Sequence, residues 1–157
     1  MSKHQELLQE FRQFAATAPS ASALMTHVSQ RLHDQMARYN WVGFYLVDPA
    51  DPGVLVVGPY VGSFSPNARI PINKGLCGAA ATTRQTVVVN DVASDPRYLS
   101  GSEIVKANMV VIPILAKNAL VAELDIESYF AHTFTKAEQT FAEEVGVLVG
   151  KFMEKKR

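Results

Sequence analysis

The sequence predicts an α+β domain, in which an antiparallel sheet carries the first and last helices of the chain on one face. Apolar residues recur at helical spacing near both ends, whereas the middle holds short β-branched and aromatic runs separated by turns. Helices gathered at the ends of the chain, rather than alternating with strands, are typical of this class. The loops within residues 62–108 are left to cover the other face, so we expect a cavity between sheet and loops.

Two helices are predicted within residues 1–38. Over residues 3–16 the apolar side chains share one side of a helix, at Leu7, Leu8, Phe11 and Phe14. Pro19 and Ser20 then break the chain. A second amphipathic helix follows, with an apolar residue at every fourth position, at Leu24, Val28, Leu32 and Met36.

Residues 41–128 are predicted to hold the sheet and the loops around a pocket. β-branched and aromatic runs predict strands over 41–47, 54–61, 86–90, 109–115 and 120–127. A short helix is expected at 76–84 and irregular chain over 62–74. Lys117 and Asn118 supply the turn between the last two strands.

The last helix is predicted over residues 135–154. Thr135 followed by Glu138 has the spacing of a capping box, in which each side chain satisfies the other residue's backbone N–H. The apolar stripe of this helix is Phe141, Val145, Leu148, Val149 and Phe152.

Length and charge limit the function classes. A chain of 157 residues suits one domain over 1–157, and fifteen basic residues balance fifteen acidic ones. Because the formal net charge is zero, the chain has no overall electric field that would attract nucleic acid or an anionic membrane, and we expect neither as a partner. No apolar run approaches the ~18 residues of a membrane span. The scattered histidines have no metal-ligand spacing.

A single cysteine fits a reducing compartment, so we expect a cytoplasmic protein.

The single cysteine, Cys77, is the first candidate for chemistry. It follows a Gly-containing turn at the start of the predicted short helix, where the helix dipole favours a thiolate and Lys74 is near. The alternative is a small buried residue that packs behind the turn. Because no base lies next to it in the sequence, we favour the second interpretation. Turnover by thiol chemistry also usually needs a second sulfur, and this chain has none.

Two sets of polar and aromatic residues are candidates for a pocket. Asp125 and Glu127 alternate with apolar residues in a strand and therefore share a face, and Glu123 is in phase with them. They could bind a cation or a ligand's ammonium, or form a solvated face; the sequence leaves both open. Trp41 and Tyr45 share a face of the first strand, where they suit a pocket wall or plain core packing.

A series of short motifs, in this order along the chain, resembles the free methionine-(R)-sulfoxide reductases, which are single GAF domains. The resemblance implies a GAF-type antiparallel sheet with N- and C-terminal helices on one face and ligand-covering loops on the other. It also implies a small-molecule pocket and a homodimer. The motifs are Asn40–Leu46, Gly58–Gly62, Arg69–Pro71, Lys74–Gly78, Asn90–Val92 and Leu124–Ser128.

The cysteines of that family are mostly missing from this chain. Members typically hold three, of which Cys77 matches the middle one. The position of the first family cysteine is occupied by Asn67 in this chain. The position of the attacking cysteine lies within Ser100, Gly101 and Ser102, where there is no sulfur. A hydroxyl cannot replace a thiolate that attacks a sulfoxide sulfur.

The binding residues of the family match better. The resemblance places Trp41, Tyr45 and Asp125 in the pocket, with Glu127 in place of a second aspartate. A family glutamate four residues before the next strand's proline falls on Met109, which would make the pocket more apolar and remove a partner for a ligand ammonium.

Three functions follow as hypotheses. The first is a GAF domain that binds a small molecule without full reductase activity, through Trp41, Tyr45, Met109, Asp125 and Glu127. The second is a reductase of free methionine-(R)-sulfoxide with Cys77 as its one catalytic cysteine and thioredoxin or another thiol as reductant. Apart from that reductant we expect no cofactor. The third is a dimerising or regulatory module that pairs through its leading helices.

Overall fold

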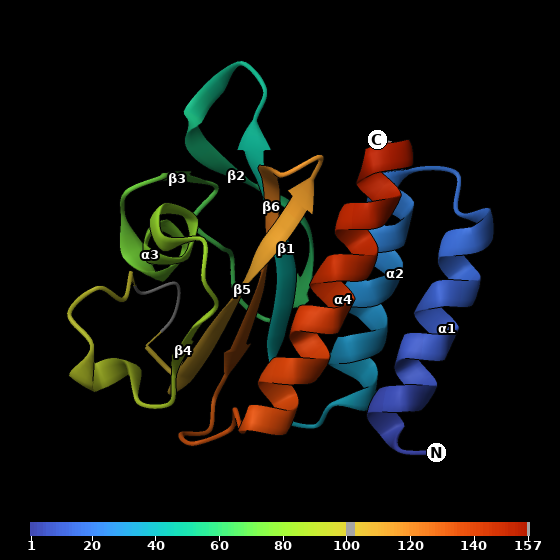
Figure 1. Cartoon of the computed structure of the whole chain (residues 1–157). Helices are drawn as coiled ribbons and strands as arrows, with labels where there is room; N and C mark the ends of the chain where they lie inside the picture. Colours follow the sequence, from blue (N-terminus) through green and yellow to red (C-terminus); the bar gives the residue numbers. More distant parts are fainter. Residues whose placement is uncertain (100–102, 157) are drawn as a thin grey trace.

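The computed structural model describes residues 1–99 and 103–156, with the backbone alone over 111–113, and is built around one antiparallel sheet (Figure 1). The strand order is β3-β2-β1-β6-β5-β4, and every neighbouring pair is antiparallel. The predicted α+β class is therefore confirmed. The strands are β1 (Trp41–Asp48), β2 (Asp51–Gly62), β3 (Arg69–Pro71), β4 (Val87–Val89), β5 (Ala107–Ala116) and β6 (Ala119–Ser128).

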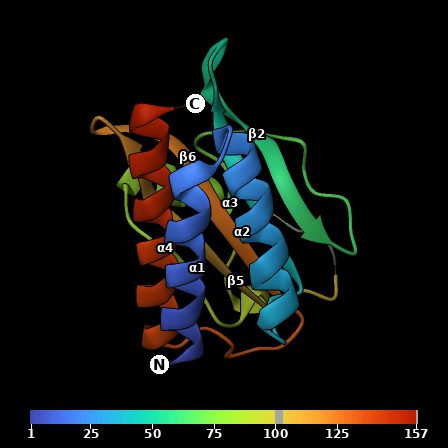
Figure 2. The ribbon, with the colours of Figure 1, turned by 90° about the vertical axis from the view of Figure 1, so that its right-hand side faces the viewer.

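The terminal helices cover one face of this sheet, as predicted. α2 (Ala21–Gln35) packs on β1 and β2, and α4 (Lys136–Lys155) packs on β5 and β6. α1 (Lys3–Thr17) lies outside both helices and runs in front of them, between α4 and α2, in Figure 2. The core between helices and sheet includes Phe11, Leu24, Phe44, Leu124 and Val145, all fully buried. Among the described residues no helix is long and apolar enough to span a membrane.

Side-chain caps begin all three of these helices. The Ser2 hydroxyl accepts from the backbone N–H of Gln5, whose side chain accepts from the Ser2 N–H, which makes a complete capping box. The box predicted for α4 is only half formed: the Thr135 hydroxyl accepts from the Glu138 N–H. The carboxylate of Glu138 instead accepts from the hydroxyl of the buried Tyr39, so tertiary structure redirects it.

The opposite face carries α3 (Gly75–Thr83), a 3-10 turn at Val92–Ser94 and the loops around them (Figure 1). The region 62–74 is less irregular than predicted, because β3 pairs with Val54–Val56 of β2. Three residues are too few to show an alternating pattern in the sequence. The predicted turn at Lys117 and Asn118 is confirmed, with both residues at the positive φ of 51° and 65° that a two-residue hairpin needs.

Candidate ligand-binding site

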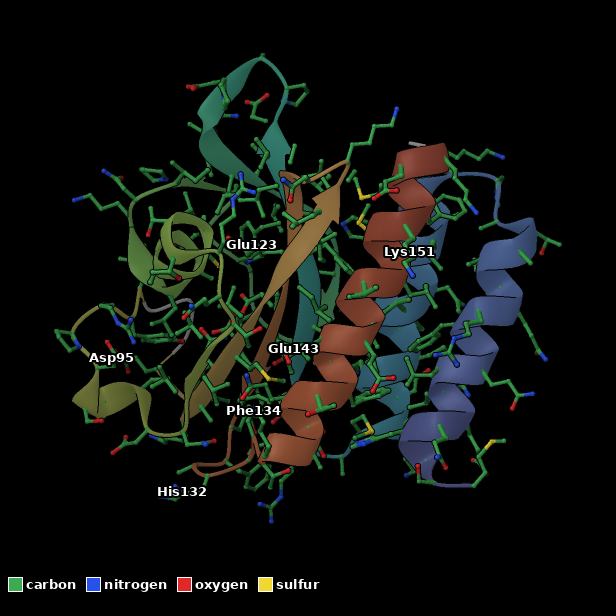
Figure 3. All side chains as sticks on the ribbon, in the orientation of Figure 1. Asp95, Glu123, His132, Phe134, Glu143 and Lys151 are labelled. Atoms are coloured by element: carbon green, nitrogen blue, oxygen red, sulfur yellow. The ribbon has the colours of Figure 1, made fainter. Side chains whose placement is uncertain are left out.

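The site begins with the alternation of side chains along β6. Leu124 and Ile126 belong to the core under the helices. Glu123, Asp125 and Glu127 point to the other face, toward α3, and their exposures are only 0%, 4% and 7%. The prediction that these acids share a face is therefore confirmed, and the solvated-face alternative is wrong. Figure 3 shows Glu123 on the side of the sheet that carries α3.

β5 brings Asn108 to the same face and turns Met109 away. Asn108 lies opposite Glu127 in the register, whereas Met109 lies opposite Ile126 and is buried in the helix-side core. The prediction that Met109 contributes to the pocket is wrong. The register shifts by one residue between Val111 and Ile114, so counting back from Pro113 does not tell which face a residue occupies.

A small cavity of about 30 Å³ lies between this face and α3. That volume holds roughly two water molecules, so a larger ligand requires the surrounding side chains to move. Leu99 lines the cavity with its side chain 45% exposed, which places it at the mouth. The polar and thiol-bearing lining residues are Tyr45, Asn67, Lys74, Cys77, Tyr98, Asn108, Asp125 and Glu127.

Trp41 supports the aromatic wall of this cavity from within the sheet. Its indole is fully buried and lies against two glycines: a Cβ on Gly62 would be 2.2 Å from the ring, and one on Gly43 would be 2.7 Å from it. The ring stacks at centroid distances of 6.4 Å on Tyr45 and 5.9 Å on Phe64, both of which line the cavity. Glycine at these positions therefore lets the indole lie flat on the sheet.

Hydrogen bonds reach two of the three acids. The Asn108 side chain donates to Oδ1 of Asp125 at 2.5 Å and to the backbone oxygen of Ile126 at 3.0 Å. The Tyr98 hydroxyl donates to Oε1 of Glu127 at 3.0 Å. Neither oxygen of Glu123 has a nitrogen or oxygen donor among the described residues.

Burial dominates the electrostatics of the site. It raises the pKa of Asp125 to about 6, although the hydrogen bonds from Asn108 and Glu127 act in the opposite direction. Burial also raises the pKa of Glu127 well above its usual value, and the charge of Asp125 adds to the effect. Burial raises the pKa of Glu123 well above its usual value, although the hydrogen bond with the Cys77 thiol lowers it; the charge of Asp125 raises it further. The three carboxyls therefore ionise at a higher pH than exposed carboxyls would.

Cys77 lies in the first turn of α3 and is 6% exposed. Burial raises the pKa of its thiol well above the usual value, and the charges of Asp125, Glu123 and Glu127 raise it further. A helix N-terminus stabilises an anion by only about 0.3–1 kcal/mol, which is less than the cost of ionising a buried group beside acids. The structure therefore disfavours an activated thiolate in the free protein and agrees with a small buried residue that packs behind the turn.

The structure brings together Trp41, Tyr45, Cys77, Asp125 and Glu127 of the predicted site. Asn67, where the first family cysteine would fall, lines the cavity, and its backbone oxygen accepts from the Tyr45 hydroxyl at 2.9 Å. The attacking-cysteine position at 100–102 lies outside the described residues.

Sequence reasoning missed two polar contributors to this site. Asn108 is in phase with Val110 on β5, but its face is known only from the register with β6. Tyr98 comes from an irregular loop with no periodic pattern, so the sequence carries no signal for its position.

The sheet, the covering helix α3 and the enclosed cavity define the class of protein. The model of the GAF domain matches residues 18–154, so the chain belongs to the GAF domain family. The fold implied by the sequence motifs is therefore confirmed.

Within that family the chain is closely related to free methionine-R-sulfoxide reductases. It is 28% identical over 134 residues to the enzyme of Escherichia coli K12, covering 85% of this chain and 78% of that one. The Neisseria meningitidis enzyme in complex with its substrate superposes with a TM-score of 0.89 at 27% identity, covering 96% and 88% of the two chains. The reduced form of the Staphylococcus aureus enzyme superposes with a TM-score of 0.88 at 26% sequence identity, covering 98% of this chain and 96% of that one.

The buried acids predict an unusual pH dependence of stability. A carboxyl whose pKa is raised in the folded state stabilises the fold while protonated, and this contribution is lost as the pH rises through the folded pKa. The pKa of Asp125 is raised to about 6. We therefore expect this carboxyl to lower the free energy of unfolding by on the order of 3 kcal/mol as the pH rises from about 4 to about 7. Urea unfolding at a series of pH values measures the change.

Asp125→Asn should flatten this profile, whereas Asp34→Asn, which changes an exposed acid on α2, should leave it unchanged. The groups that face Asp125 are Glu123, Glu127, Cys77 and Tyr45. Asp48 and Asp95, which are half-buried, have lowered pKa values, so the stability that they contribute is lost as the pH falls through those lowered values. A stability that climbs steadily from pH 5 to pH 8 in the unmodified protein would contradict the prediction.

Proposed function

We propose that this chain binds a small molecule carrying an ammonium or similar donor group in the acid-lined cavity, and that it lacks the activity of a dedicated reductase. The observation that supports this most is the set of buried acids, Glu123, Asp125 and Glu127, on one face. The cation among the described lining residues is Lys74, whose side chain is exposed. Buried carboxyls without a buried cation are costly unless a ligand supplies the charge.

The surroundings of the acids indicate the rest of the ligand. Tyr45, Phe64 and Tyr98 present aromatic rings to the cavity, and Trp41 stacks behind them. Such walls suit an apolar or aromatic body, and their faces also attract a cation. A ligand ammonium would donate a charge-assisted hydrogen bond to the carboxylate of Asp125 and would favour the ionised form of that carboxyl.

Binding without turnover is favoured by the state of the sulfur. The chain has one cysteine, and the thiol of Cys77 is buried beside carboxyls that oppose its ionisation. Sulfoxide attack requires a thiolate and, for repeated cycles, a way to resolve the oxidised sulfur.

We expect a panel of free amino acids and aromatic amines, including methionine and methionine-(R)-sulfoxide, to contain a compound that raises the melting temperature. A ligand at ~100 times its Kd adds about 2.7 kcal/mol, which corresponds to a shift of roughly 5–10 °C for a domain of this size. Asp125→Asn should remove the shift, and Asp34→Asn should retain it. The proposal fails if no compound distinguishes the unmodified protein from Asp125→Asn.

A single-cysteine reductase is the second candidate, because Cys77 lines the same cavity as Asp125 and Glu127. In this reaction the Cys77 sulfur attacks the sulfoxide sulfur and takes its oxygen, which releases free methionine and leaves a sulfenic acid. Thioredoxin or another dithiol then reduces the sulfenic acid to the thiol and water and becomes a disulfide itself.

The two candidates differ in one assay, the dithiol-dependent loss of free methionine-(R)-sulfoxide. We expect the unmodified protein and Cys77→Ser to give the same low rate, because the thiol is protonated and no second cysteine resolves it. A rate in the unmodified protein that is tenfold or more above that of Cys77→Ser would instead establish the reductase.

We further propose a homodimer that pairs through the outer face of α1 and α4, in the cytoplasm, where a lone cysteine stays reduced. The apolar residues Leu7, Leu8 and Phe11 of α1 are buried within the chain, so they do not form this surface. A hollow of about 450 Å³ is lined instead by Arg12 of α1 and, from α4, by Thr140, Glu143, Glu144, Val147, Leu148 and Lys151.

Charge and exposure support a two-fold arrangement at this surface. Val147 is 46% exposed, and acidic and basic residues lie on the same face, so two copies related by a two-fold axis could pair Glu144 with Lys151. Figure 3 places Lys151 on α4, across the sheet from Glu123, so the cavity would stay accessible in such a dimer.

Val147→Glu should weaken self-association at least tenfold, because it places like charges at the centre of the interface. Sedimentation velocity across a concentration series measures this effect. Ser94→Glu, an exposed change beyond the opposite face of the sheet, serves as the control. An unmodified protein that remains monomeric at every concentration would exclude the dimer.

A further inference from the structure

Glu123 differs from the other two buried acids of the site in the groups that surround its carboxyl. It is fully buried, and neither carboxylate oxygen has a nitrogen or oxygen donor among the described residues. The polar group that interacts with it is the Cys77 thiol, which is a weak donor. Nearly all buried polar groups in native proteins are paired, so an unpaired carboxyl requires an explanation.

A structural role does not explain Glu123. An unpaired buried polar group costs about 1–3 kcal/mol, and an apolar side chain of similar size would pack under α3 without that cost. The neighbouring acids differ in this respect, because Asn108 donates to Asp125 and Tyr98 donates to Glu127. Glu123 is therefore an acceptor that is available for a group from outside the chain.

The position of Glu123 relative to Asp125 gives a spacing for such a group. The two residues lie on one face of β6 with a single residue between them, and side chains in this relation are about 7 Å apart. Across the sheet, Glu123 pairs with Tyr45 and Asp125 pairs with Gly43. An ammonium contacts its acceptor at about 2.8 Å, so a group held at Asp125 leaves Glu123 for a second one.

We propose that the cavity takes a ligand with two cationic groups, a short α,ω-diamine or a basic amino acid, with one group at Asp125 and the other at Glu123. The inference rests on the proposed ligand-binding function and specifies the ligand class. A chain of four methylene groups between two amines spans about the distance that separates the two acids. The ring of Tyr45 beside Glu123 adds an aromatic face for the second cation.

The path from the cavity to Glu123 passes Cys77. Cys77 lines the cavity and Glu123 is not among the lining residues, but the two side chains interact. A cysteine side chain is small, so a change of its rotamer opens the deeper end of the site without a movement of the backbone. This arrangement also gives Cys77 a role that needs no redox chemistry.

The test compares 1,4-diaminobutane with 1-aminobutane, which has the same carbon chain and one charge, by calorimetry at pH 7.5 and constant ionic strength. We expect the diamine to bind at least tenfold more tightly to the unmodified protein. In Glu123→Gln the two probes should bind within about twofold of each other, because the second carboxylate is gone. Asp125→Asn should weaken both probes, and Asp34→Asn should weaken neither.

Two further comparisons keep the inference testable. Ethane-1,2-diamine, which is too short to span the acids, should show no advantage over the monoamine. If Glu123→Gln does not fold, Glu123→Leu gives the same comparison, because it removes the unpaired carboxyl and should stabilise the fold.

The possible results separate this inference from the function on which it rests. Equal binding of diamine and monoamine to the unmodified protein, or a diamine advantage that survives in Glu123→Gln and Glu123→Leu, overturns the inference but leaves ligand binding at Asp125 intact. If neither probe binds but another amino acid does so through Asp125, the inference also fails alone. If no compound binds, both fail.

Discussion

The burial of three carboxyls on one face of β6 is the constraint on which the rest of the site depends. Side chains alternate along a strand, so the anchoring of Leu124 and Ile126 under the helices forces Glu123, Asp125 and Glu127 under α3. The acids cannot reach solvent without breaking the helix-side core. The protein therefore maintains an acidic interior that Asn108 and Tyr98 complement only in part.

The same burial governs the single thiol. The start of α3 would favour a thiolate at an exposed position, but Cys77 faces the acids in a dehydrated space, and its pKa is raised. A site that favours cations and disfavours a second anion suits recognition of an amine better than nucleophilic attack. The relation to free methionine-R-sulfoxide reductases thus describes the scaffold, and the residues in the cavity decide what it does.

Local sequence patterns predicted the elements well because they reflect interactions close along the chain. The helical spacing of Leu24, Val28 and Leu32 and the turn residues Lys117 and Asn118 specify their elements almost without help. The errors arose where a distant partner intervened. Glu138 bonds Tyr39 rather than its own helix start, and β3 exists only through its pairing with β2.

Periodicity and composition are local properties of the chain, so they were enough to predict the α+β class and the shared face of the acids on β6, and to show the lack of a second sulfur. The pairing of the strands places Asn108 rather than Met109 at the cavity and leaves Glu123 without a nitrogen or oxygen donor among the described residues. Each of these depends on a register between strands, where a shift of one residue exchanges the two faces of a sheet. The degree of burial, and with it the protonated state of Cys77, likewise follows from how α3 covers the sheet.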